Sequence, residues 1–176
     1  MAQHQALREL QSRLAEKLLA ARTEVRGASW LAVEAGGGAF LLSLADAGEI
    51  FPDTGVLPMP HTQAWFGGVA NLRGVLHGVV DLAAFLGLPP RAGAETAGRE
   101  ASRLVALNPA LGAMAALRVD RLAGLRRPDE MTAEPASDEL RPAFARGRWT
   151  AADGRSWQEI DLSLLASNER FLAIAA

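Results

Sequence analysis

The side chains that could carry chemistry in this chain are few and scattered. The three histidines, His4, His61 and His77, lie in different segments, and none has a second histidine or a carboxylate at metal-ligand spacing. The sequence has no cysteine, which rules out disulfides, thiolate metal sites and catalytic thiols. It contains neither a nucleophile-elbow motif nor a phosphate-binding loop. These observations predict no cofactor, and they favour binding over catalysis.

Two further groups of residues could be sites of chemistry. Asp46 and Glu49 are close in sequence, but two carboxylates without a defined cleft more often form a solvated edge than an acid–base pair. The glycines at 36–38 do not open a helix, so they do not suit a phosphate. Glu49, flanked by Ile50 and Phe51, is interpreted either as a rim carboxylate or as part of a recognition edge.

Arg73 is the only charged side chain between Gly67 and Val80. The surrounding residues predict two strands, 69–72 and 75–80, joined by a turn at Arg73-Gly74, since glycine permits positive φ and Asn71 tolerates irregular backbone. A guanidinium in such an apolar hairpin needs a carboxylate or several carbonyls as partners. Arg73 is therefore either a structural residue that pins two loops together or a residue offered to another protein.

Period-two hydrophobicity predicts that most of the chain is β. Strands are expected at 30–33, 39–44, 102–107, 114–119, 122–125, 143–149 and 156–160, and residues 45–51 are expected to leave the second of these and enter another short strand. Asp153-Gly154 is a strong hairpin turn between the last two strands. The prolines from 52 to 60 predict an extended loop, after which Thr62 is expected to cap one helical turn. Residues 89–100 are predicted to be an exposed linker and residues 128–142 an acidic loop.

A short motif occurs twice. Val80-Asp81-Leu82 and Ile160-Asp161-Leu162 each follow a predicted hairpin, and each aspartate is placed to cap a short helix. The repeat predicts two similar small β lobes, and short strands at regular spacing favour barrels over an open sheet. The linker places the division between these lobes near residues 88–101.

The first 27 residues are predicted to form an amphipathic helix. One face carries an apolar stripe at steps of three and four: Leu7, Leu10, Leu14, Leu18, Ala21 and Val25. Gly27 ends the pattern. The stripe either packs on the body of the domain, which is the favoured interpretation, or docks a partner. Residues 28–176 then form the β domain.

Size and charge set further bounds. The chain has 176 residues and a net charge of −2, so it is long enough for a proper core and has no overall basic field for nucleic acid or anionic lipid. No apolar run reaches the roughly 20 residues that span a bilayer, and no secretory signal is visible. The expectation is a cytoplasmic protein without direct membrane insertion.

The central motif resembles the signature of the CheW-like domain family. Its parts are Gly68-Val69, Asn71-Leu72-Arg73-Gly74 and, five residues on, Val80-Asp81-Leu82. The likeness extends from Ser29 to Leu172, and residues 78–87, after an N-terminal helix, are most similar to the PilI-type adaptors of twitching motility. It implies two five-stranded SH3-like barrels, with an N-terminal α-helix and short helices, around a hydrophobic seam.

The same resemblance implies a non-enzymatic adaptor that couples a chemoreceptor of the methyl-accepting type to the regulatory domain of a CheA-type histidine kinase. The protein would work at receptor arrays near the inner membrane, in a pathway that controls type IV pili. By resemblance, receptor-side contacts fall on Ala47, Glu49, Gly68, Asn71, Arg73 and Gly74. Two alternatives stay open: a small β-barrel ligand-binding protein or enzyme that uses the seam as a pocket, and an SH3-like scaffold outside bacterial signalling.

Overall fold

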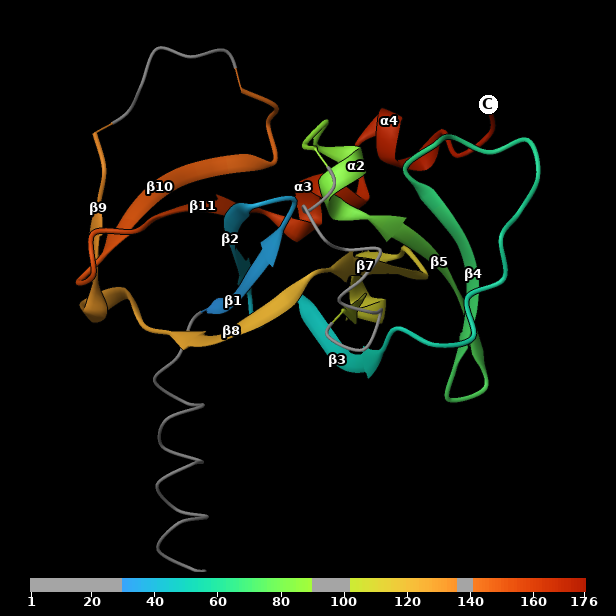
Figure 1. The fold of residues 1–176 in the computed structure, drawn as a ribbon, viewed down its shortest axis with the longest axis horizontal. Coiled ribbons are helices and arrows are strands. Elements are labelled where there is room, and N and C mark those ends of the chain that lie inside the picture. Colours follow the sequence, from blue (N-terminus) through green and yellow to red (C-terminus); the bar gives the residue numbers. More distant parts are fainter. Residues whose placement is uncertain (1–29, 90–101, 136–140) are drawn as a thin grey trace, which may run out of the picture.

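The computed structural model describes residues 30–89, 102–135 and 141–176. The predicted N-terminal helix at 1–27 and nearly all of the predicted linker lie outside the described residues. The described part contains eleven strands, three short α-helices and two single 3-10 turns, arranged as two lobes side by side (Figure 1). The prediction of a mainly β fold with two lobes is confirmed.

The first lobe is built on a six-stranded sheet in the order β8-β1-β2-β11-β10-β9. Its strands are β1 (Trp30–Ala35), β2 (Gly38–Ser43), β8 (Arg121–Arg126), β9 (Met131–Ala133), β10 (Ala145–Ala151) and β11 (Ser156–Ile160). The resemblance implied five strands. The sixth is β9, which the sequence placed in a loop that now begins with the 3-10 turn η2 (Pro128–Glu130). Pairing with β10 orders this segment, and its own hydrophobic pattern does not reveal that pairing.

The second lobe is built on a five-stranded sheet in the order β3-β6-β7-β5-β4. Its strands are β3 (Ala47–Pro52), β4 (Phe66–Leu72), β5 (Val75–Asp81), β6 (Arg103–Leu107) and β7 (Ala115–Val119), and the 3-10 turn η1 (Pro109–Leu111) joins the last two. β4 and β5 form the predicted hairpin.

The chain changes sheet between Ser43 and Ala47 and again between Val119 and Arg121. The predicted division near 88–101 is therefore wrong for the sheets, because β5 and β6, which flank that segment, share the second sheet. Parallel pairing of β5 with β7 and of β2 with β11 joins strands that are distant in sequence. The predicted linker has no hydrophobic periodicity, and nothing in its sequence indicates which distant strands pair.

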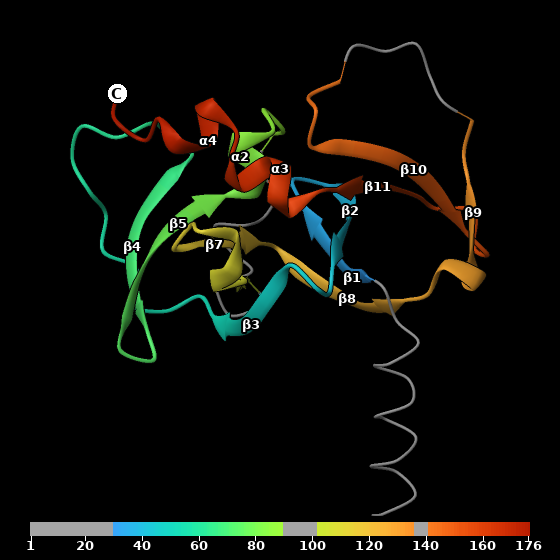
Figure 2. The ribbon, with the colours of Figure 1, turned by 180° about the vertical axis from the view of Figure 1, so that it is seen from behind.

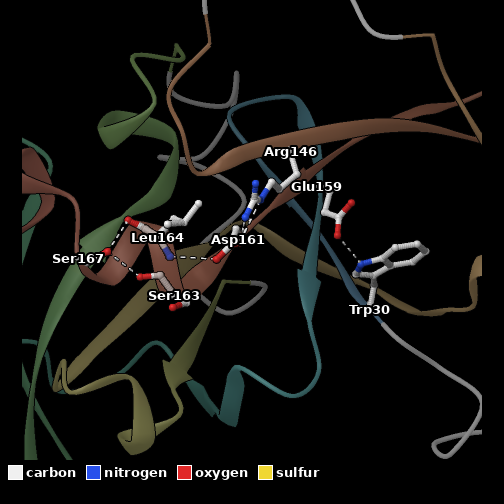
Figure 3. Close-up of polar contacts among 7 residues, drawn as sticks. All are labelled: Trp30, Arg146, Glu159, Asp161, Ser163, Leu164 and Ser167. Carbon is white, nitrogen blue, oxygen red and sulfur yellow. Dashed lines mark hydrogen bonds and ion pairs between the residues drawn. The ribbon is translucent and has the colours of Figure 1, made fainter.

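The repeated motif ends an equivalent hairpin in each lobe. Asp81 Oδ1 accepts from the Ala84 N–H at 3.0 Å and begins α2 (Leu82–Phe85), and Asp161 Oδ1 accepts from the Leu164 N–H at 2.9 Å and begins α3 (Leu162–Ala166). Figure 3 shows the second cap, with Arg146 donating to the other carboxylate oxygen at 2.8 Å. The capped-helix prediction is confirmed in both lobes.

Three buried clusters explain how two small sheets remain together. One lies within the first lobe around Trp30 and Trp157, and a second within the other lobe around Leu72 and Leu104. The third is the largest and draws residues from both sheets and from α2, α3 and α4 (Glu169–Leu172). This third cluster is the hydrophobic seam that the family resemblance implied.

Aromatic rings form the centre of the seam. Phe85 lies 5.1 Å from Trp65, 5.9 Å from Phe144 and 5.5 Å from Phe171, measured between ring centroids. Such edge and tilted contacts add to the free energy of burial. In Figures 1 and 2, α2, α3 and α4 gather at one end of the molecule, while the β4–β5 turn projects at the other.

Thr62 does not cap a helical turn, so that prediction is wrong. It forms an isolated antiparallel bridge with Ala175, and its hydroxyl donates to the Met59 carbonyl at 2.9 Å. The C-terminal tail supplies this bridge from more than a hundred residues away, which overrides the local capping preference. Trp65 and Phe66 are nevertheless buried as expected.

Glu34 stabilises the point between Val119 and Arg121 where the chain passes from the second sheet back to the first. Its carboxylate accepts from Arg121 at 3.0 and 2.6 Å and also from Arg155, so it joins β1, the start of β8 and the segment before β11. The hydrogen bond from Arg121 is the largest cause of a lowered pKa for Glu34; burial opposes it and Arg155 reinforces it. Asp161 also has a lowered pKa: burial raises it, but the Leu164 N–H and Arg146 together outweigh burial.

Both shifts predict acid sensitivity. A carboxylate whose pKa is lower in the folded state stabilises the fold above its unfolded pKa, and this contribution is lost as the pH falls through the folded value. The free energy of unfolding should therefore decrease as the pH drops below about 4.5, the ordinary value for glutamate. Urea titrations from pH 7 to 3 should show a flatter decline for Glu34→Gln than for wild type. An identical slope in the two proteins would contradict the assignment to Glu34.

Candidate functional site

The turn between β4 and β5 holds Arg73 in an unusual backbone conformation. Arg73 and Gly74 have φ of 51° and 87°, the pattern of a type I′ hairpin turn. A side chain other than glycine in the left-handed region costs about 1–2 kcal/mol. The Asn71 Oδ1 accepts from the Gly74 N–H at 2.7 Å and supports the turn. Asn71 thus has a defined role in placing Arg73 at the tip.

Arg73 meets a carboxylate from a different strand. Its Nη2 lies 2.6 Å from Glu49 Oε1, and the two side chains are 75% and 44% exposed. An exposed ion pair stabilises a fold by only about 0–1 kcal/mol. The carboxylate partner expected for Arg73 is therefore present, but the exposure of the pair leaves both groups available to another molecule.

The ion pair forms the rim of an open groove of about 330 Å³, which we call the β3 groove. Strand β3 and the segment after it supply one wall and the hairpin the other, and the lining residues are Glu49, Ile50, Phe51, Pro52, Thr54, Asn71, Leu72 and Arg73. β3 and β4 stand at opposite edges of the strand order, so the curl of the sheet brings the hairpin tip beside β3. Val75 and Leu76, just past the turn, are 47% and 66% exposed. The groove thus combines an apolar floor and flank with a charged rim.

The structure brings together four of the six predicted site residues. Glu49, Asn71 and Arg73 line the β3 groove, and Gly74 completes the turn. Ala47 is half-buried at the start of β3, opposite Leu107.

Gly68 is the sixth predicted residue, and it is buried beneath the chain at Leu57-Pro58 instead of lining the groove. Its φ is +123°, and a Cβ added there would lie 2.0 Å from the Leu57 carbonyl oxygen. This close approach allows Leu57 and Val69 to exchange backbone hydrogen bonds of 2.8 and 2.9 Å. Gly68 therefore positions the β4 strand and makes no contact at the groove surface.

The sequence did not reveal a buried ion pair directly behind the groove. Asp53, 6% exposed, accepts from Arg118 Nε at 2.9 Å and from Arg118 Nη2 at 3.1 Å. The Ser102 hydroxyl donates to the same carboxylate at 2.8 Å. Asp53 directly follows β3 and Arg118 lies on β7, so the pair holds one groove wall to the sheet. A lone aspartate after a proline offered no signal for a partner 65 residues away.

The histidines do not form a site within the described part of the chain. His77 is buried, with Nδ1 3.1 Å from the Val75 carbonyl oxygen, and His61 lies in an exposed loop. No three histidines or carboxylates are grouped there so as to hold a metal ion. Across the same residues, none of the helices is long and apolar enough to cross a membrane.

Comparison with known proteins defines the class. The CheW-like domain family matches residues 29–170, which is most of the chain. The chain therefore belongs to the CheW-like domain family, whose members are scaffold and adaptor domains. This confirms the resemblance drawn from the Asn71–Gly74 motif and the two lobes.

Two relatives refine the comparison. The chain is 29% identical to Protein PilI of Pseudomonas aeruginosa over 93% of this chain and 89% of that protein. It also matches the crystal structure of the scaffolding protein TtCheW from Thermoanaerobacter tengcongensis, with a TM-score of 0.62 and 22% identity, over 77% of this chain and 89% of the other. The first supports the PilI-type resemblance, and the second confirms the fold.

Proposed function

We propose that this chain is a non-enzymatic adaptor that couples the cytoplasmic tip of a methyl-accepting receptor to a CheA-type histidine kinase, at receptor arrays near the inner membrane. The pathway is a chemotaxis-like one that controls twitching motility by type IV pili, which the similarity to PilI supports. The observation that carries the proposal is the exposed Arg73–Glu49 pair on the rim of the β3 groove.

The chemistry of the groove fits a helical partner. An amphipathic helix binds by laying apolar side chains into a groove, while charged residues at the edge fix its orientation. Ile50 and the half-buried Phe51 offer apolar surface, and Arg73 and Glu49 can each exchange their mutual contact for an opposite charge on the partner. Because the pair is exposed, such an exchange costs little.

The kinase would bind elsewhere, at the ends of the barrels, through its matching regulatory domain. A receptor and a kinase can then occupy the adaptor together. Signalling requires that the receptor make different contacts with the adaptor in its two states, because only a difference in affinity shifts an equilibrium. No chemical step on the adaptor is needed.

A pocket in the seam has less support. The alternative, a ligand-binding protein or enzyme, places its site between the lobes. That region is filled by the buried rings of Trp65, Phe85, Phe144 and Phe171. Such rings in contact occupy the space that a ligand would need.

Replacing Arg73 with alanine tests the proposal. We expect about a tenfold or greater loss of affinity for a receptor tip, since a hydrogen bond to a charged group contributes about 1.5–3 kcal/mol. Affinity for the kinase regulatory domain should change less than about twofold. Isothermal titration calorimetry with each partner measures both.

The matched control is Arg127→Ala. Arg127 is also an exposed arginine with an acidic neighbour, 3.0 Å from Glu130, but it lies in the first lobe. It should bind the receptor tip as wild type does. Equal receptor affinity for folded Arg73→Ala and wild type would remove the β3 groove from receptor binding.

A further inference from the structure

We propose that the β3 groove selects its partner by secondary structure. Strand β3 cannot pair with a further strand, so only a partner that binds through its side chains, such as a helix, fits the groove. Pro52 and the irregular pair Gly48-Glu49 are the residues that determine this specificity. That the bound helix belongs to a receptor rests on the function proposed above, whereas the exclusion of strands does not depend on it.

The two edge strands of the second sheet differ in what covers their outer sides. Beyond β5, β4 also pairs with Leu57, which exchanges backbone hydrogen bonds of 2.8 and 2.9 Å with Val69. Among the described residues, β3 pairs with β6 alone, and its other side lines the β3 groove. An uncovered edge carries unpaired backbone N–H and C=O groups and ordinarily accepts another strand. The β3 edge therefore needs a feature that prevents such pairing.

Pro52 removes the backbone donor at the end of this edge. Pro52 lies opposite Arg103 of β6, and a proline, which has no N–H, holds such a place only where its nitrogen faces away from the neighbouring strand. The Pro52 carbonyl oxygen already accepts from the Thr54 N–H at 2.9 Å. An added strand would therefore find no donor at Pro52 and an acceptor already in use. Residues two apart in an antiparallel ladder face the same way, so the backbone of Ile50 also faces the groove.

A β-bulge interrupts the edge on the other side of Ile50. The register of β3 against β6 shifts between Ala47 and Ile50, so that Gly48 and Glu49 together lie opposite one residue of β6. A Cβ at Gly48 would lie 3.0 Å from the Ala106 carbonyl oxygen, so glycine permits the close approach of the two strands. A bulge twists a strand and breaks its regular ladder. Between the bulge and Pro52, only Ile50 presents both an N–H and a C=O toward the groove.

A helix and an extended chain place different demands on this edge. The backbone N–H and C=O groups of a helix are already bonded to one another, so a helix needs only space for its side chains. The groove of about 330 Å³ offers that space, with Ile50 and the half-buried Phe51 on its β3 wall. An extended chain would instead bury N–H and C=O groups that β3 leaves unpaired, and each such group carries a desolvation cost. The groove therefore favours a helix over a strand.

Restoring a regular edge tests the exclusion of strands. Pro52→Thr supplies the missing N–H, and a second variant adds the deletion of Gly48, which removes the bulge. The probe is a labelled synthetic peptide of residues 102–108, because it contains β6, the natural antiparallel neighbour of β3. Fluorescence anisotropy with the full-length proteins should show the peptide bound about tenfold or more tightly by the second variant than by wild type. Pro52→Thr, which leaves the register unchanged, should lie between the two.

The matched control is Pro60→Thr, which makes the same exchange in an exposed turn outside the strands. It should bind the peptide no better than wild type does. Sedimentation velocity over a concentration series gives a second readout that needs no peptide. Two regular β3 edges can pair with each other, so both edge variants should form more dimer than wild type and Pro60→Thr.

The outcomes separate this proposal from the proposed function, because no receptor is present in either measurement. The exclusion of strands would be overturned by tight binding of the peptide to wild type, or by equal peptide affinity and equal dimer content in wild type and the folded edge variants. If Arg73→Ala loses receptor affinity as expected, the receptor function survives that result. The expected peptide binding, in a protein that binds no receptor tip, would retain the exclusion of strands and reject the receptor function.

Discussion

Asp53→Ala is expected to lower the free energy of unfolding by about 3–5 kcal/mol, because removing one partner of a buried pair leaves an uncompensated charge. Asp53 accepts three hydrogen bonds, two from Arg118 and one from Ser102. Without the carboxylate, the guanidinium of Arg118, only 21% exposed, loses its bidentate partner. Urea unfolding at pH 7 measures the difference.

Glu130→Ala is the control for this change. Glu130 also pairs with an arginine, at 3.0 Å from Arg127, but the two side chains are 46% and 41% exposed. Loss of such an exposed ion pair should lower the free energy of unfolding by no more than about 1 kcal/mol. If Asp53→Ala destabilised the protein no more than Glu130→Ala, the buried pair would not be what holds β3 to the sheet.

Gly68→Ala is the second change with a large expected effect. The added Cβ would meet the Leu57 carbonyl oxygen at 2.0 Å and Pro58 Cα at 2.8 Å, both backbone atoms that cannot move aside cheaply. Overpacking of about 1–3 kcal/mol adds to a positive-φ cost of about 1–2 kcal/mol, so we expect a loss of about 3 kcal/mol or more. A thermal melt followed by circular dichroism measures it.

Gly74→Ala separates the two contributions. Gly74 also has positive φ, +87°, but nothing lies within 4 Å of the position of its Cβ. Gly74→Ala should lower the free energy of unfolding only by the cost of the positive φ, about 1–2 kcal/mol. Equal losses for the two variants would show that the contact at Leu57 is not what requires glycine at 68.

We expect stability and partner binding to depend on different charges in this protein. The buried Asp53–Arg118 pair holds the wall of the groove, whereas the exposed Arg73–Glu49 pair forms its rim. A buried charge without its partner is costly, so each member of the Asp53–Arg118 pair depends strongly on the other. The Arg73–Glu49 pair is exposed to solvent, so either member can exchange its partner at little cost. Variants at the rim should therefore change binding with little effect on folding, and variants behind the wall the reverse.

Local features of the fold were predictable from sequence because their hydrogen bonds close within a few residues. Asp81 and Asp161 cap the residues three positions later, and Asn71 supports the turn at Arg73-Gly74 through the amide of residue 74. Period-two hydrophobicity placed most strands, and the repeated motif indicated two lobes. That Arg73 needs a carboxylate or several carbonyls as partners also followed from the cost of an unpaired guanidinium.

The tertiary structure decided what depends on contacts between distant residues. It determined that β1 and β2 join the C-terminal strands, that Thr62 pairs with Ala175, and that Gly68 lies beneath Leu57. It also selected Glu49 as the partner of Arg73, because the curl of the second sheet brings its two edges together. Hydrophobic period and turn chemistry act over a few residues, whereas the pairing of sheet edges is set by packing of the whole chain.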